Sequence, residues 1–381
     1  GRQLKAMDIE RSRTASEDGD IMSTGSMAGL ENLWSSGSGT ASGLRTHALK
    51  CVNTLSGHHS GIRVIAVLNN RIFTGSYDNT IKVWNLDGGS CEATLEGHIA
   101  WIRSLFCHAR DPLLFSGSDD GIIKVWRTDT HVHVHDILPP TIEGEEEQAA
   151  NRGILAITVD YERSWLLAGS YDSHIYIWEF PSCNFLHLLS GHRSAVRSLV
   201  IYNGCLMSGS YDRTVKLWQL EEPETCVGSL GTRGSVWTLA VHAGMLLGAI
   251  GDSSIKVWRM DSWEQIATLS GHRGLVLALA THNDWLVSGS DDRCIRVWRM
   301  GSWECERILT GHNGGVVGVC IVQGHWQASI CSARPLSGTL PSPMKRLGSA
   351  FDCTGNLISA SNDSFIKVWN STGIQRPFTA K

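Results

Sequence analysis

The sequence predicts an all-β protein, a seven-bladed β-propeller of four-stranded antiparallel blades, and two observations predict it. A tryptophan follows an aspartate by six residues in seven places, and the offset never changes. Most of these tryptophans recur at a period near 40 residues, which is the period of a propeller blade. A feature repeated seven times is an architecture rather than a single active site. The pairs are Asp78–Trp84, Asp120–Trp126, Asp172–Trp178, Asp212–Trp218, Asp252–Trp258, Asp292–Trp298 and Asp363–Trp369.

Each unit consists of short apolar runs separated by turn residues. In the fourth unit the runs are 196–201, 206–211 and 214–218, with Gly, Asn and Asp between them. No window shows sustained helical periodicity, and four such runs make one antiparallel blade. A further strand at Leu49–Leu55 precedes the first unit, and the seventh unit lacks a clear outer strand. We therefore expect this N-terminal outer strand to pair with the seventh unit and close the ring.

Composition divides the chain into a propeller at 46–370 and two tails. Residues 1–45 are rich in Ser, Gly and charge, a composition that predicts a disordered tail, and 371–381 form a C-terminal tail. The repeat is interrupted by insertions at about 139–150 and 325–351. The first insertion carries Glu145–Glu147 and is interpreted as a solvated loop or as a docking site for a basic partner. The second is interpreted as a long loop or as an artefact of the gene model.

Charge and cysteine content exclude several classes of protein. The formal net charge of −4 gives no general attraction to nucleic acid or to an anionic membrane. No apolar run is long enough to span a bilayer. The eleven cysteines include no C-x-x-C pair and are typical of small core residues in a reducing compartment. These observations predict a cytoplasmic or nuclear protein.

Gly-His pairs before most units, together with phrases such as Ile81-Lys82-Val83-Trp84, resemble the WD-repeat family over roughly 46–370. The resemblance implies a hydrogen-bonded chain in each matching blade, from a histidine through a strand hydroxyl, such as Thr74 or Ser208, to the aspartate and the tryptophan. Buried polar groups of this kind must be paired to avoid a desolvation penalty. The residues given this structural role are His58, Asp78, Trp84, His98, Asp120, Trp126, His192, Asp212, Trp218, His272, Asp292, Trp298, His312, Asp363 and Trp369.

The same side chains would also suggest a Ser–His–Asp hydrolase triad. A triad needs one exposed nucleophile and an oxyanion hole, whereas this set recurs along the chain, so we favour the structural role. Two units depart from the pattern. Their histidine position falls on Ala150 in the third unit and on Thr232 in the fifth, and the fifth also has Gly248 in place of the hydroxyl. We expect these two blades to be less stable than the others.

Side chains at the start of the first strand and before the turn aspartate are predicted to surround the central channel on one face. Arg, Tyr and Trp dominate there in the first four units, and these residue types often anchor interfaces. We expect Arg63, Arg103 and Arg197 to converge and hold a carboxylate or phosphate. The alternative is that each is solvated or has a local acidic partner. The predicted partner-binding residues are Arg63, Tyr77, Trp101, Arg103, Asp119, Tyr171, Arg197, Tyr211, Trp237 and Asp291.

The leading function is therefore a non-enzymatic scaffold that binds an acidic or phosphorylated peptide or partner surface, within a larger complex and without a cofactor. The family resemblance extends to propellers that act as substrate receptors of ubiquitin ligases. An alternative is an RNA-associated subunit, which would need a continuous basic patch. A third is a zinc enzyme at His131, His133 and His135, which a strand would place on one face beside the nearby glutamates.

Overall fold

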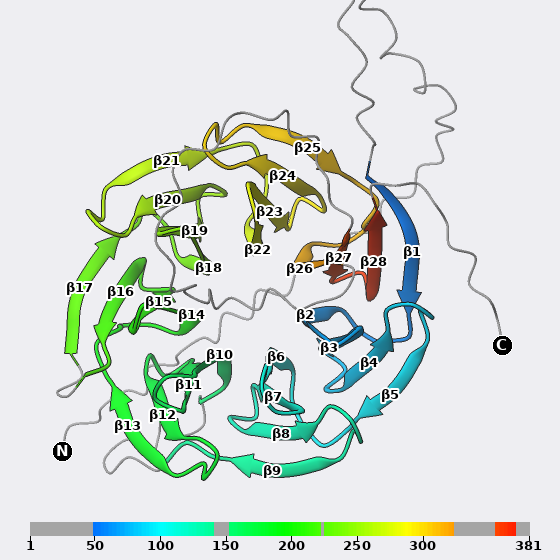
Figure 1. The fold of residues 1–381 in the computed structure, drawn as a ribbon, viewed down its shortest axis with the longest axis horizontal. Helices are drawn as coiled ribbons and strands as arrows, with labels where there is room; N and C mark the ends of the chain where they lie inside the picture. The colour runs from blue at the N-terminus through cyan, green and yellow to red at the C-terminus, as the bar shows by residue number, and fades with distance from the viewer. Residues whose placement is uncertain (1–48, 141–151, 222–224, 324–354, 371–381) are drawn as a thin grey trace, which may run out of the picture. The chain divides into compact units, whose positions relative to one another are not determined.

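In the computed structural model, the chain is described for residues 49–140, 152–221, 225–323 and 355–370. These residues form seven four-stranded antiparallel sheets that surround a central channel (Figure 1). The all-β, seven-bladed propeller expected from the repeat is thus confirmed. The tails expected at 1–45 and 371–381 and the insertion at 325–351 lie outside the described residues. Of the insertion at about 139–150, only 139 and 140 are described.

The four strands of each sheet run from the channel to the rim. The strands that line the channel are β2 Ile62–Leu68, β6 Ile102–Cys107, β10 Ile154–Asp160, β14 Val196–Tyr202, β18 Val236–His242, β22 Val276–His282 and β26 Val316–Gln323. The second strands are β3 Arg71–Ser76, β7 Leu113–Ser118, β11 Trp165–Ser170, β15 Cys205–Ser210, β19 Met245–Ile250, β23 Trp285–Ser290 and β27 Gly355–Ser361.

The third strands end in or just after the repeated tryptophan. They are β4 Ile81–Asn85, β8 Ile123–Arg127, β12 Ile175–Glu179, β16 Thr214–Gln219, β20 Ile255–Arg259, β24 Ile295–Arg299 and β28 Phe365–Asn370. The outermost strands are β5 Cys91–Leu95, β9 His133–Ile137, β13 Phe185–Leu189, β17 Thr225–Gly231, β21 Gln265–Leu269, β25 Cys305–Leu309 and β1 Lys50–Ser56.

The seventh sheet combines strands from distant parts of the chain. The strand expected at Leu49–Leu55 is β1, which begins one residue later, and it pairs antiparallel with β28. Within this pair Leu55 lies opposite Ile366. The order β1-β28-β27-β26 places β1 at the outer edge, as Figure 1 shows.

The hydrophobic core consists of layers between neighbouring sheets. Buried side chains of one sheet pack against those of the next, as Phe106 and Phe115 do with Ile154. The same packing joins the seventh sheet to the first through Ile358 and Ile72. Apolar area buried in each layer stabilises the blades at about 25 cal/mol per Å². The ring of sheets is therefore held together by interfaces of one kind.

A glycine in the second strand allows the sheets to approach closely. A Cβ atom on Gly209 would lie 2.5 Å from Val236 Cγ1 of the next sheet. Carbon atoms do not approach so closely, so any side chain here would push the two sheets apart. The repeated Ser-Gly-Ser phrase thus reflects packing between blades as well as strand formation.

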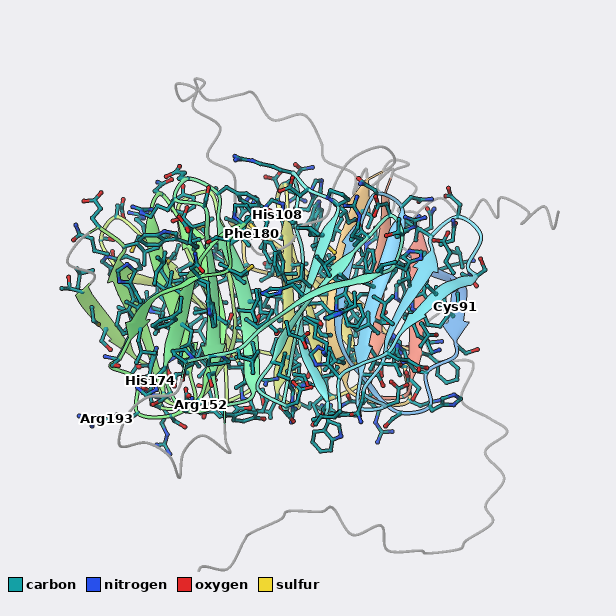
Figure 2. All side chains as sticks on the ribbon, turned by 90° about the horizontal axis from the view of Figure 1, so that it is seen from below. Cys91, His108, Arg152, His174, Phe180 and Arg193 are labelled. Atoms are coloured by element: carbon teal, nitrogen blue, oxygen red, sulfur yellow. The ribbon has the colours of Figure 1, made fainter. Side chains whose placement is uncertain are left out.

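The loops divide between two faces. The turns that join the second and third strands lie on one face, together with the starts of the channel-lining strands. We call this the channel face. In the side view, Arg152, His174 and Arg193 lie at this face, and His108 and Phe180 lie at the opposite face (Figure 2). Within the described ranges there is no helix with the length and apolar character needed to cross a membrane.

Candidate functional site

One backbone hydrogen bond, repeated in every sheet, assembles the channel face. The residue before the turn aspartate donates its N–H to a carbonyl just before the channel-lining strand. Examples are Tyr77 to Gly61 at 3.0 Å and Tyr211 to Ala195 at 3.1 Å. Both predicted sets of side chains therefore lie on the same face of the ring. The structure brings together Arg63, Tyr77, Trp101, Arg103, Asp119, Tyr171, Arg197, Tyr211 and Trp237 around the channel and its mouth.

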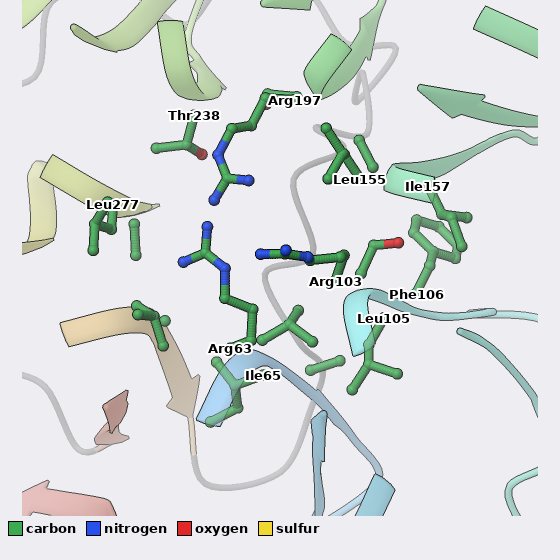
Figure 3. A pocket seen from close by; sticks show the side chains of 18 of the residues that line it. Arg63, Ile65, Arg103, Leu105, Phe106, Leu155, Ile157, Arg197, Thr238 and Leu277 are labelled. Atoms are coloured by element: carbon green, nitrogen blue, oxygen red, sulfur yellow. The ribbon is translucent and has the colours of Figure 1, made fainter. Parts of the chain in front are cut away.

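The channel itself is a cavity of about 210 Å³ lined by the innermost strands. Figure 3 shows the guanidinium groups of Arg63, Arg103 and Arg197 pointing toward one another in it, with Leu155 and Leu277 among the apolar side chains around them. The convergence expected from the sequence is therefore present. The three arginines nevertheless differ in their partners.

Arg103 is already occupied by a carboxylate. Its Nε and Nη2 donate to the two oxygens of Asp119, each at 2.7 Å. Its guanidinium also lies over the rings of Trp101, at 4.9 Å, and of Tyr77 and Tyr171, at 5.8 Å each. A bidentate pair of this geometry fixes both side chains. For Arg103 the contacts therefore fit the alternative of a local acidic partner, and its binding of a ligand stays a prediction.

Arg63 and Arg197 have no carboxylate partner among the described residues. Arg63 is only 9% exposed, and burial lowers its pKa because the charged form loses hydration, with repulsion from Arg103 acting in the same direction. Arg197 lies over Trp237 at 4.9 Å and over Tyr211 at 5.8 Å, and its Nε is buried without a hydrogen-bond partner in the described chain. Two cationic groups are thus available to an anion that enters the channel.

The aromatic side chains are not equally accessible. Trp101 is 47% exposed and makes an edge contact with Tyr77 at 4.7 Å. Tyr211 makes a similar contact with Trp237 at 5.3 Å, and both of these rings are half-buried. Burial raises the pKa of the Tyr171 and Tyr211 hydroxyls, so both remain protonated donors. Trp101 is therefore the aromatic residue best placed to contact a partner.

Asp291 does not join the arginine cluster. It is exposed on the turn before β24, and its N–H donates to the carbonyl of Leu275 at 2.9 Å. No described arginine forms an ion pair with it. Its predicted role in binding a partner has no support from these contacts.

The hydrogen-bonded chain implied by the family resemblance is present in five sheets. In the fourth unit the ring of His192 contacts Asp212 at 2.7 Å and the Ser208 hydroxyl at 2.6 Å, and Trp218 Nε1 donates to that hydroxyl at 2.7 Å. Ser208 is fully buried. A nucleophile that is buried and already accepts a hydrogen bond from tryptophan cannot attack a substrate, which argues against a hydrolase triad here. Equivalent contacts start from His58, His98, His272 and His312.

These networks shift the pKa values of their members. Burial lowers the pKa of His192, although the bond to Asp212 acts in the opposite direction. For Asp78, burial alone would raise the pKa, but hydrogen bonds from Thr80 and His58 outweigh it and lower the pKa to about 2. In the fourth unit the pKa of Asp212 is lowered as well, so the network there favours a neutral histidine beside an ionised carboxylate.

The third unit replaces the missing histidine in a way that the sequence interpretation did not anticipate. Its second strand carries Ala168 instead of a hydroxyl, and the fully buried Tyr176 donates its own hydroxyl to Asp172 at 2.6 Å. The available signal was the position of Tyr176, where the other units have Lys or Arg. In the fifth unit, Gly248 stands at the position of the missing hydroxyl. The Trp258 ring packs against it, 2.9 Å from where a Cβ atom of this glycine would be. Ala150, the expected histidine position of the third unit, lies outside the described residues.

The three histidines proposed as a zinc cluster do not share a strand face. His131 has a φ of 62° and lies in the turn before β9, which begins at His133. The His133 ring contacts Asp136 at 2.7 Å. The glutamates proposed as further ligands lie outside the described residues. Within the described ranges, no three His, Cys, Asp or Glu side chains come together as metal ligands.

The architecture is that of a β-propeller built from repeated four-stranded blades with a polar channel face. A family model described as "WD domain, G-beta repeat" matches residues 49–85, 89–127, 145–179, 183–219 and 263–299. The chain belongs to this WD-repeat family.

Several curated proteins are similar to parts of the chain. Pre-mRNA-splicing factor PRP46 of Candida albicans is 46% identical over 70 residues, which are 17% of this chain and 18% of that protein. Cell division control protein 4 of Saccharomyces cerevisiae is 30% identical over 161 residues, 38% of this chain and 20% of that protein. WD repeat-containing protein pop2 of Schizosaccharomyces pombe is 26% identical over 172 residues, 40% and 19% respectively. The matches thus span about a fifth of each relative.

Proposed function

We propose that this protein is a non-enzymatic interaction scaffold that binds a peptide or partner surface on its channel face. The observation that carries the proposal is that Arg63 and Arg197 are directed into the channel and have no carboxylate partner among the described residues. WD-repeat propellers are in general protein-interaction scaffolds, which supports the same function.

The chemistry of the channel favours an anionic group on the partner. Each guanidinium presents five N–H donors in a planar fork that matches a carboxylate or a phosphate. Removal from water strengthens such contacts, because the local dielectric falls. An acidic or phosphorylated side chain that enters between Arg63 and Arg197 would satisfy donors that the described chain leaves unpaired. Trp101, which lies against Arg103, would pack against an apolar part of the same partner.

The proposal is tested by affinity purification from cell extract followed by mass spectrometry. The variant Arg63→Gln/Arg197→Gln removes both channel charges. The matched control, Arg110→Gln/Arg259→Gln, removes two exposed arginines from the opposite face. Both variants must first show the melting temperature of the unchanged protein. Selective loss of partners from the channel variant supports the proposal, and an identical partner list for both variants contradicts it.

The same experiment addresses the more specific roles. A substrate receptor of a ubiquitin ligase would co-purify with ligase subunits, and an RNA-associated subunit would co-purify with ribonucleoprotein components. A cytoplasmic or nuclear site is part of the proposal and is supported by the nine described cysteines, all of which are free. No observation in the described chain favours the zinc-enzyme alternative.

A further inference from the structure

Five exposed arginines form a basic crescent on the channel face of the fourth, fifth and sixth units. Three of them occupy the same position of successive units, one residue after His192, Thr232 or His272. The other two follow the turn aspartates Asp212 and Asp292. The crescent consists of Arg193, Arg213, Arg233, Arg273 and Arg293.

Backbone contacts show that neighbouring members of the crescent are adjacent. The N–H of Arg193 donates to Asp212 Oδ2 at 3.0 Å, which places it beside Arg213. The N–H of Thr232 donates to the carbonyl of Arg213 at 2.8 Å, so that Arg233 follows. In the sixth unit the N–H of Arg273 donates to Asp292 Oδ2 at 2.9 Å, which places it beside Arg293. Figure 2 shows Arg193 on the face opposite His108.

None of these arginines forms an ion pair with a carboxylate of the described chain. Two of the carboxylates beside them are turned inward, since Asp212 and Asp292 contact buried histidines at 2.7 and 2.8 Å. Asp252 and Asp291 are exposed next to the crescent, and Asp252 accepts a hydrogen bond from the N–H of Ser254 at 3.1 Å. The five arginines therefore outnumber the exposed carboxylates beside them. Positive charge gathered on one side of a face attracts anionic partners and repels cationic ones.

The opposite side of the channel face has a different character. The crescent positions of the first and second units hold His59, Asn79, Ile99 and Gly121. Ile99 is 83% exposed and Trp101 is 47% exposed, an unusual exposure for large apolar side chains on one loop. The channel face therefore has a basic side and an apolar side, with Arg63 and Arg197 between them.

We propose that the partner is a polypeptide segment with two parts: an acidic run that crosses the crescent, and an apolar or aromatic side chain that packs on Ile99 and Trp101. This inference rests on the proposed function, since it names the chemistry of the partner at the same face. The acidic run would pair with arginines that lack carboxylates, and its anchor would cover apolar surface that is now exposed to water.

The surface is less suited to a nucleic acid. Single-stranded nucleic acids bind through aromatic rings on which bases stack. Near the crescent, Tyr211 and Trp237 are half-buried and already contact Arg197, so neither ring offers a free face.

The test is fluorescence anisotropy with defined probes. One peptide carries a run of glutamates followed by a Leu-Trp pair, and a second replaces that pair with Ser-Gly. An oligouridylate of equal net charge is the third probe. The crescent variant Arg193→Gln/Arg233→Gln/Arg273→Gln is compared with Arg110→Gln/Arg127→Gln/Arg259→Gln, which removes three exposed arginines from the opposite face. Melting temperatures identify any variant that is misfolded.

We expect the first peptide to bind most tightly, and we expect the crescent variant to weaken its binding about tenfold while the opposite-face variant leaves it unchanged. High salt should remove most of this difference. The variant Trp101→Ala should reduce binding of the first peptide to the level of the second.

Three results would overturn the inference. If the two triple variants bind the first peptide equally well, the crescent is rejected as its binding surface. The proposed function would still stand if the Arg63→Gln/Arg197→Gln variant loses partners in the purification experiment. Tighter binding of the oligouridylate than of the peptides would assign the surface to nucleic acid. Absence of binding by every peptide would reject the acidic-anchor partner, and the purification experiment would decide the proposed function independently.

Discussion

Replacement of Ser208 by alanine measures what the repeated hydrogen-bonded chain contributes to stability. The Ser208 hydroxyl is fully buried, contacts the His192 ring at 2.6 Å and accepts from Trp218 Nε1 at 2.7 Å. Its removal leaves two buried polar groups without a partner. Each such group costs about 1–3 kcal/mol. We therefore expect Ser208→Ala to lower the free energy of unfolding by about 2–4 kcal/mol, the sum being reduced by relaxation of the site.

The assay is urea denaturation followed by tryptophan fluorescence. Ser262→Ala, at an exposed position in the turn before β21, is the control and should change the free energy of unfolding by less than about 0.5 kcal/mol. A double variant that also carries His192→Leu removes one of the two unsatisfied groups. Its loss of unfolding free energy should be smaller than the sum of the losses of the two single variants, because both single variants break the same hydrogen bond between His192 and Ser208.

A loss of less than about 0.5 kcal/mol for Ser208→Ala, equal to the control, would refute this reasoning. The third unit shows why the surroundings matter. It carries Ala168 at this position without an orphaned histidine, because Tyr176 supplies the hydrogen bond to Asp172. A unit that keeps its histidine has no such compensation.

Three further predictions concern the same architecture. Tyr176→Phe removes the 2.6 Å bond to Asp172 and should lower the free energy of unfolding by about 1–3 kcal/mol in urea denaturation, whereas equal stability would show that Asp172 is satisfied without it. Gly209→Ala should cost about 1–3 kcal/mol because its Cβ would meet Val236 at 2.5 Å, whereas Gly231→Ala, with no atom within 4 Å, should be neutral by the same assay. Acid should destabilise the protein in two stages, measured as melting temperature against pH. In the folded protein, burial lowers the pKa values of His58, His192, His272 and His312. Below about pH 6.5 the unfolded chain therefore binds more protons than the folded protein, and stability falls. Below about pH 4 the unfolded chain likewise protonates carboxylates whose folded pKa values are lowered, Asp78 to about 2. A melting temperature that stays constant between pH 7 and pH 5 would contradict the first stage.

The blades were predictable because their determinants are local and repeated. The aspartate, the tryptophan and the Gly-His pair each occupy a fixed position within about 40 residues, so that the sequence indicates turns and strands independently of the rest of the chain. The positions of Arg63 and Arg197 within the repeat also predicted the face of the ring on which they lie. These features need no knowledge of which side chains meet across blades.

Contacts between side chains were harder to predict. The pair formed by Arg103 and Asp119 depends on rotamers of two residues in one unit, and the sequence interpretation assigned both of them to a ligand. The prediction that His131 shares a strand face with His133 and His135 was wrong, because His131 itself has a positive φ and lies in the turn before β9. The basic crescent had a signal in the spacing of Arg193, Arg233 and Arg273 by one repeat, but exposure could not be read from spacing alone.

The seventh sheet takes its strands from both ends of the propeller, and this affects the order in which the sheets assemble during synthesis. Thr54 in β1 and Lys367 in β28 contact each other across 313 residues of sequence. At about 5–20 residues per second, the ribosome needs about 15–60 s to make the chain between them. During that time β1 has an unpaired edge, which is a site of aggregation in newly made chains. The other six sheets can each assemble as they emerge, so assembly of the seventh is expected to be the step most exposed to chaperones and to misassembly.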